Sequence, residues 1–243
     1  MRRIVVIALS VMLALVVAIP MASGKPATTE HEQKASHPGN PKKNLPDLTG
    51  EWWNWGFQKP SPLVGSYNKN SPKCEGKYVP GVFFLAGSAF DPKMPSVERN
   101  CTVPARKPIL LPVVNVICSK AFTGHQPKPD PKPYDKGCAE PITDDVIDPP
   151  SKFFATLDGK DLKQRRIASG IFQWTIESKK NPYGLDPGTY PAASDGLWVF
   201  LKDGLKPGKH TIKFGGTFKD TPFGNFEETH VTYHLKAVKK ADR

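Results

Sequence analysis

Hydrophobic and polar positions alternate most clearly in the last third of the chain, over residues 194–238. Residues 197–201 form a continuous apolar run between Gly196 and Gly204, which is typical of a buried strand rather than a helix. Residues 210–214 and 229–237 repeat with a period of two, which places alternate side chains on one face. The pattern predicts three successive antiparallel strands whose apolar face needs a second layer to cover it.

Similar patterns earlier in the chain are expected to supply that second layer. Asp158-Gly159 favours a type I′ hairpin turn, because both positions of that turn need a positive φ. Pro112 lies inside an apolar run and predicts a sheet edge or a bulge, because proline cannot donate to a ladder. The further strands are expected at residues 79–86, 97–103, 109–118, 153–157, 160–162 and 171–176.

These elements predict an all-β fold, a two-sheet antiparallel sandwich of jelly-roll type with few helices. Residues 119–151 and 179–193 are expected to be long loops, the first of them rich in proline.

The N-terminus has the pattern of a signal peptide over residues 1–24. Arg2 and Arg3 precede an apolar run at residues 4–19, and small residues lead up to Gly24. The alternative is an uncleaved anchor, for which the run is shorter than the roughly 20 residues of a spanning helix. Residues 25–46 are predicted to be a disordered leader rich in Lys and Pro, and residues 47–243 a single domain. We therefore expect a secreted protein (extracellular, periplasmic or cell-surface) with no transmembrane segment after cleavage.

The four cysteines predict two disulfides, because an even number in an exported chain usually forms a covalent framework. Three pairings are open; Cys74–Cys101 with Cys118–Cys138 is preferred because it closes the shorter loops. No C-x-x-C or H-x-H pair occurs, so neither a metal site nor a cofactor is predicted.

The charge of the chain bears on the class of partner. The chain has 34 basic and 23 acidic residues, and removal of residues 1–24 leaves 32 basic residues and a net charge of +9. A basic surface favours acidic glycans, anionic envelope polymers or nucleic acid. Nucleic acid is not expected, because the lysines are scattered and no nucleic-acid-binding motif is present. The plain alternative is that the lysines only keep the protein soluble.

The candidate binding residues are an aromatic ring, an amide and a carboxylate. Trp52, Trp53 and Trp55 lie close together on a strand or a short helix, where they form either core or a platform for sugar rings. We assign Trp53 and Trp55 to the core and expect Trp52 to be the exposed ring. Asn115 is a lone polar residue in an apolar strand, and Asp195 precedes the run at residues 197–201. The predicted binding residues are therefore Trp52, Asn115 and Asp195, whereas no catalytic residue is identified.

Several stretches give the chain a family likeness. They are residues 52–55 (WWNW), 84–87 (FLAG), 101–107 (CTVPARK), 112–118 (PVVNVIC), 195–199 (DGLWV) and 205–216 (LKPGKHTIKFGG). With these motifs the chain resembles a family of secreted β-sandwich proteins with no established activity. The resemblance covers most of residues 50–238 and implies the fold, and it implies no catalytic residues.

Three functions are consistent with these observations. The first is a non-catalytic module that binds a polysaccharide or cell-surface polymer, and the second is a structural envelope or matrix protein with no small ligand. The third is a secreted hydrolase that uses Asp195 with Asn115 or a loop carboxylate. The sequence leaves open the ligand, the oligomeric state and the glycosylation of the sequon at Asn100.

Overall fold

The computed structural model describes residues 44–65, 76–79, 81–87, 96–122, 139, 144, 147, 151–221 and 224–239. These residues fall within a single unit, Lys42–Arg243. The predicted signal peptide, nearly all of the predicted leader and most of the proline-rich loop lie outside the described residues. Among the helices that the structure describes, none has the length and apolar character needed to cross a bilayer.

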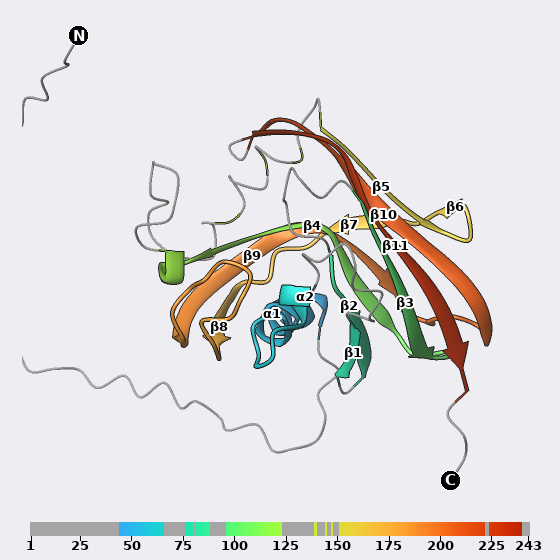
Figure 1. The fold of residues 1–243 in the computed structure, drawn as a ribbon, viewed down its shortest axis with the longest axis horizontal. Helices are drawn as coiled ribbons and strands as arrows, with labels where there is room; N and C mark the ends of the chain where they lie inside the picture. The colour runs from blue at the N-terminus through green and yellow to red at the C-terminus, as the bar shows by residue number, and fades with distance from the viewer. Residues whose placement is uncertain are drawn as a thin grey trace, which may run out of the picture. The chain divides into compact units, whose positions relative to one another are not determined.

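The protein is mostly β, with two sheets, as predicted (Figure 1). The first has the order β1-β2-β4-β9-β7, and β8 also pairs with β9; the second has the order β3-β11-β10-β5-β6. The six-stranded sheet consists of β1 (Gly76–Val79), β2 (Val82–Leu85), β4 (Ile109–Ser119), β7 (Gln164–Arg166), β8 (Ile171–Ile176) and β9 (Gly188–Leu201). The five-stranded sheet consists of β3 (Ser96–Pro104), β5 (Lys152–Leu157), β6 (Lys160–Asp161), β10 (Gly208–Thr221) and β11 (Gly224–Val238). The helices are α1 (Leu45–Gly56), α2 (Pro62–Gly65) and the 3₁₀ turn η1 (Lys120–Phe122).

The expected three-strand meander is wrong for its first member. β10 and β11 pair in antiparallel fashion as predicted, whereas β9 belongs to the other sheet. Residues 197–201 of β9 lack alternation, because both faces of this strand are covered. The apolar run therefore did not indicate which sheet contains β9. Trp198 packs in one apolar cluster and Val199 in another, and both side chains are buried. A strand that is covered on both faces has a continuous apolar run instead of an alternating pattern.

The all-antiparallel expectation is also wrong, because two strand pairs are parallel. β3 runs parallel to β11 along Ser96–Pro104, and β2 runs parallel to β4 over a shorter stretch. Both pairs join strands that are not connected by a tight turn, so nothing in the local sequence required them to be antiparallel.

One buried cluster contains side chains from strands of both sheets. Along β10 and β11, Ile212, Phe214, Val231, Tyr233 and Leu235 are buried, which confirms the alternation that the sequence predicted. From the six-stranded sheet the same cluster takes Ile109, Leu111, Val113 and Val199.

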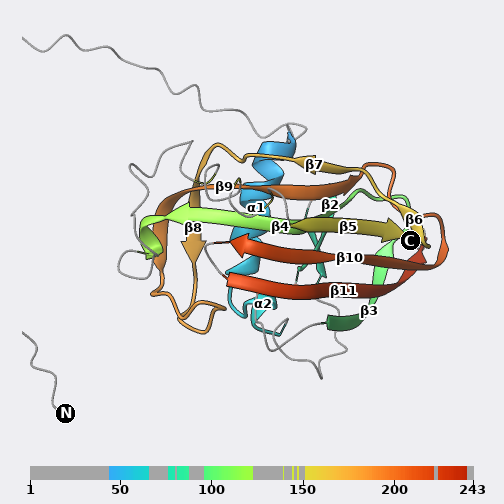
Figure 2. The ribbon, with the colours of Figure 1, turned by 90° about the horizontal axis from the view of Figure 1, so that it is seen from above.

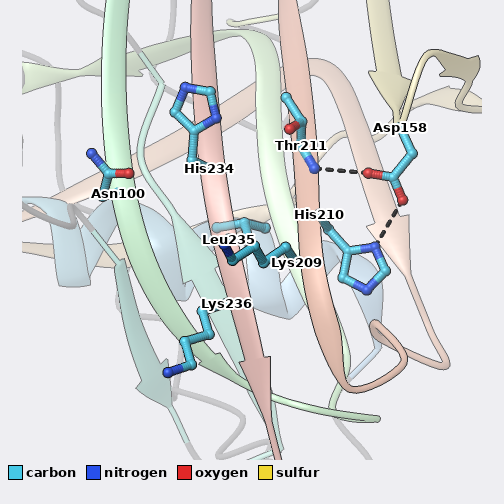
Figure 3. A pocket seen from close by; sticks show the side chains of 8 residues that line it. All are labelled: Asn100, Asp158, Lys209, His210, Thr211, His234, Leu235 and Lys236. Atoms are coloured by element: carbon cyan, nitrogen blue, oxygen red, sulfur yellow. Dashed lines mark hydrogen bonds and ion pairs between the residues drawn. The ribbon is translucent and has the colours of Figure 1, made fainter.

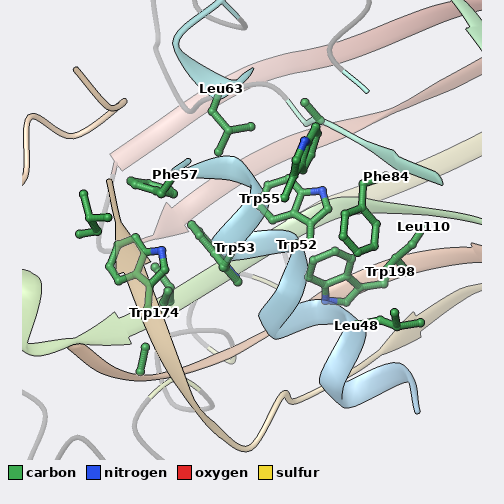
Figure 4. Close-up of a cluster of buried hydrophobic side chains, with 14 of the residues drawn as sticks. Leu48, Trp52, Trp53, Trp55, Phe57, Leu63, Phe84, Leu110, Trp174 and Trp198 are labelled. Carbon is green, nitrogen blue, oxygen red and sulfur yellow. The ribbon is translucent and has the colours of Figure 1, made fainter. Parts of the chain in front are cut away.

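The tryptophans form a second cluster between α1 and the six-stranded sheet (Figure 4). Asn44 caps α1 by accepting a hydrogen bond from the Asp47 amide at 2.9 Å. The helix crosses the strands of that sheet (Figure 2) and buries Trp52, Trp53 and Trp55. The alternative of a short helix is therefore the right one for this segment, and the core assignment of Trp53 and Trp55 is confirmed.

The helix also closes an edge of the six-stranded sheet. The Asn54 amide nitrogen donates to the carbonyl of Gln173 at 3.0 Å, and its oxygen accepts from the amide of Thr175 at 2.7 Å. The side chain thereby takes the place of a neighbouring strand along β8 and satisfies two backbone groups there.

One turn and one bulge are confirmed. Asp158 and Gly159 have φ values of 51° and 77°, the left-handed region that a type I′ turn needs. The register of β4 against β9 shifts between Pro112 and Val114, which is the predicted bulge. β4 is nevertheless a central strand and not an edge, because it lies between β2 and β9.

The two cysteines that the structure describes, Cys101 and Cys118, are buried and are not free thiols. Cys74 and Cys138 lie outside the described residues, so the pairing stays a prediction.

Candidate functional site

The structure does not bring the three predicted binding residues together. Trp52 is only 3% exposed, and its indole nitrogen donates to the carbonyl of Leu85 at 2.9 Å. The prediction of an exposed Trp52 ring is therefore wrong. The indole cannot present a face to a sugar, because it is enclosed by the rings of Trp53, Trp55 and Trp198.

Asn115 and Asp195 lie on opposite faces of the six-stranded sheet. Asn115 is opposite Gly196 in the ladder, and Asp195 is opposite Val116. Side chains that face each other across a ladder share a side, and neighbours along a strand alternate. The two residues therefore cannot form the proposed hydrolytic pair. Asn115 is half-buried, and its amide nitrogen has no hydrogen-bond partner among the residues that the structure describes.

Asp195 is an internal anchor for Arg166. The carboxylate is 1% exposed and accepts hydrogen bonds from Arg166 Nε at 2.7 Å and from the Gly196 amide at 2.8 Å. Arg166 Nη1 also reaches Asp144 at 2.5 Å. The hydrogen bond to Asp195 is the main reason that the pKa of Arg166 lies above its ordinary value. A carboxylate that is buried and held by two donors in this way is a structural group.

The outward face of the five-stranded sheet gathers polar and basic side chains in rows across four strands. The register aligns residues of β3, β11 and β10; β5 continues two of the rows, and Asp158 in the turn after β5 continues a third. Because side chains alternate along a strand, these positions point away from the buried cluster of Val231, Tyr233 and Leu235. The rows are Ser96, His230, Gly215 and Phe154; Glu98, Thr232, Lys213 and Thr156; Asn100, His234, Thr211 and Asp158; and Thr102, Lys236 and Lys209. We call this set the outer face.

Cations outnumber anions on the outer face. Lys209 and Lys236 are adjacent in one row, and Lys213 lies on the same face of β10. The carboxylates are Glu98, which lies 3.5 Å from the His234 Nε2, and Asp158. No arginine stands among these positions, so the face carries point charges and hydroxyl or amide groups rather than planar guanidinium forks.

A depression of about 370 Å³ lies on this side of the sheet (Figure 3). Its lining draws on four separate parts of the chain, which the fold brings side by side. The lining residues are Asn100 of β3; His234, Leu235 and Lys236 of β11; Lys209, His210 and Thr211 of β10; and Asp158 of the β5–β6 turn.

His210 and Asp158 form a hydrogen-bonded pair at the depression. His210 Nδ1 lies 2.8 Å from Asp158 Oδ2, and its Nε2 lies 2.9 Å from the carbonyl of Lys206. The other carboxylate oxygen of Asp158 accepts from the Thr211 amide at 2.8 Å. The hydrogen bond to Asp158 raises the pKa of His210 against the opposing effect of burial. Burial would raise the pKa of Asp158, but its hydrogen bonds from His210 and Thr211 outweigh burial and lower it.

Comparisons with known proteins give no family. No protein-family profile matches the chain, and no curated protein matches it. One solved structure, "Structure of PbICP-C in complex with falcipain-2", is 7% identical over 64% of this chain and 98% of that chain, with a TM-score of 0.25. At that TM-score the likeness carries no argument, so the family resemblance in the motifs stays a prediction.

The outer face was not predicted from the sequence, although the alternation over residues 229–237 indicates part of it. The alternation over residues 229–237 predicts that the polar positions face solvent, which His234 and Lys236 confirm, whereas Thr232 is buried. What the sequence does not contain is the register that aligns them with β3 and β10. His210 is hydrogen-bonded and half-buried, and no local motif distinguishes it from an ordinary strand residue. Among the described residues, no group of three or more His, Cys, Asp or Glu is arranged to hold a metal ion.

Proposed function

We propose that this chain is a secreted, non-catalytic binding module for an acidic polysaccharide, which lies across the outer face of the five-stranded sheet. The observation that carries the proposal is the convergence of Lys209, Lys236 and His234 with Asn100 and Thr211 around one depression. The cations suit the carboxylate or sulfate groups of such a polymer, and the amide and hydroxyl groups suit its hydroxyls.

The shape of the site supports a polymer rather than a small metabolite. The polar rows extend over four strands, whereas small-molecule sites are mostly apolar clefts that enclose their ligand. The basic residues of the outer face include lysines and no arginines. Lysine is a point charge and suits the charge density of a polymer, whereas arginine is the residue that binds one anion in a bidentate way. Binding is therefore expected to weaken as salt is added, because exposed charges are screened within about 10 Å at 0.1 M ionic strength.

The finer features of the fold are part of the same proposal. We infer that the two sheets pack as a sandwich, which is supported by the buried cluster that both share. We also infer the pairing Cys74–Cys101 and Cys118–Cys138. It is supported by Cys118, which packs against Ala193 and against Ala139, the residue after Cys138. Peptide mapping without reduction tests the pairing.

The test of the binding function compares two variants with equal charge loss. In the first, Lys209 and Lys236 of the outer face are both replaced by Gln. In the matched control, Lys179 and Lys180 are replaced by Gln; both are exposed and follow β8 of the other sheet. Immobilised polygalacturonate, dextran sulfate and neutral dextran serve as probes.

We expect the first variant to lose about ten-fold in affinity for both acidic polymers, since an exposed charge contact is worth up to about 1 kcal/mol. The control is expected to change by less than about two-fold, and neutral dextran is not expected to bind. Equal losses in the two variants would attribute binding to net charge alone and not to the outer face. Absence of binding to either acidic polymer would contradict the function and favour a structural protein.

A further inference from the structure

His210 lies between two groups that only accept hydrogen bonds. Its Nδ1 contacts the Asp158 carboxylate at 2.8 Å, and its Nε2 contacts the backbone carbonyl of Lys206 at 2.9 Å. A neutral imidazole has one N–H and can donate to only one of them, whereas the imidazolium donates to both. The geometry therefore fits the charged form of His210, and the raised pKa agrees with it.

The two acceptors belong to the two turns that flank the depression. Asp158 is the first residue of the β5–β6 hairpin turn, and Lys206 lies in the connection from β9 to β10. Protonated His210 joins these turns, and the Asp158 carboxylate is further fixed by the Thr211 amide. We call this set of contacts the His210 clamp.

Other charged groups surround the clamp. Lys160 of β6 acts on Asp158 through its charge. Lys209 of β10 and Lys236 and His234 of β11 line the same depression. With His210 protonated, the His210–Asp158 pair is neutral and the lysines dominate the local charge. With His210 neutral, the Asp158 carboxylate is uncompensated beside those lysines.

We propose that the His210 clamp makes the binding of acidic polysaccharides dependent on pH, with tighter binding when His210 is protonated. This inference rests on the proposed function. Loss of the proton removes one positive charge from the site, and it also breaks one of the two bonds that hold the flanking turns. Both effects disfavour an anionic ligand, the first by electrostatics and the second by loosening the depression.

The test uses dextran sulfate, because its sulfate charge does not change over the range studied. Affinity is measured from pH 5.5 to pH 8.5 at constant ionic strength for the wild type and for His210→Gln, which stays neutral throughout. The same comparison is made in a His234→Gln background, which removes the other imidazole of the depression. Thermal unfolding at each pH establishes that the variants are folded.

We expect the wild type to bind about two- to five-fold more tightly than His210→Gln at pH 5.5, the effect of one charge near the ligand. The ratio of the wild-type affinity to the His210→Gln affinity should approach one at high pH. It should depend on pH in the same way in the His234→Gln background. A ratio that is constant with pH would overturn the inference while leaving the proposed function intact. Absence of binding in all variants at all pH values would overturn both.

A second measurement needs no variant and no ligand. Long-range ¹H–¹⁵N spectra of the wild type distinguish an imidazolium from the two neutral tautomers. We expect His210 to carry protons on both nitrogens at pH 6. A neutral tautomer at that pH would contradict the clamp.

Discussion

Replacement of Trp52 by Phe separates a structural role of this residue from a binding role. The change removes the indole N–H, which donates to the Leu85 carbonyl at 2.9 Å in a buried site. A hydrogen bond of this kind is worth about 1 kcal/mol. The smaller ring also leaves space in a cluster where Trp52 contacts three other indoles with centroid separations of 5.3, 5.9 and 5.6 Å. Partial cavities of that size cost about 1–2 kcal/mol.

The expected loss for Trp52→Phe is therefore about 2–3 kcal/mol in the free energy of unfolding. Urea denaturation followed by circular dichroism measures it, with Ile171→Ala as a control, because Ile171 is 59% exposed and should change stability by less than about 0.5 kcal/mol. The affinity of folded Trp52→Phe for dextran sulfate should stay within about two-fold of the wild type. Unchanged stability together with lost binding would refute the burial of Trp52 and restore it as a ligand platform.

Three further predictions concern the packing and the clamp. Asp195→Asn should destabilise the protein by about 1–2 kcal/mol in urea denaturation, because the buried acceptor of the Arg166 and Gly196 N–H groups loses its charge while Asp144 still pairs with Arg166; a loss below about 0.5 kcal/mol would show that the ion pair is dispensable. Gly204→Ala should cost more than Gly184→Ala in the same assay. Both glycines have positive φ (61° and 64°), but a Cβ at Gly204 would meet a backbone oxygen at 2.1 Å, whereas at Gly184 it meets nothing within 4 Å; equal losses would argue against the packing of that turn. The unfolding free energy of the wild type relative to His210→Gln should be largest between about pH 4 and pH 6.5. It should fall as the pH rises through the raised pKa of His210 and as it drops through the lowered pKa of Asp158, and a difference that does not vary with pH would contradict the clamp.

The fold was predictable where one side of an element faces water. The alternation in β10 and β11 and the Asp158-Gly159 turn are local signals, and the structure confirms both. β9 was misplaced because it is buried on both faces, and its apolar run does not say which sheet contains it. The parallel pairing of β3 with β11 joins distant segments, which no local pattern reveals.

The candidate site was less predictable than the fold. Asp195 and Trp52 were predicted to bind a ligand, because a carboxylate beside an apolar strand and a ring in a tryptophan cluster are often functional. Both side chains are instead buried and hydrogen-bonded. Lys209, His234 and Asn100 are ordinary solvated residues in their own strands. They come together only through the register of three strands, which is a property of the tertiary structure.

The most direct measurement of the central claim is an NMR titration of ¹⁵N-labelled protein with short polygalacturonate fragments. We expect amide shifts to change around Asn100, Thr211 and His234 on the outer face, whereas the indole signal of Trp52 and the amides of residues 177–187 should not move. Shift changes concentrated at those latter groups, or no changes at millimolar fragment, would contradict the central claim.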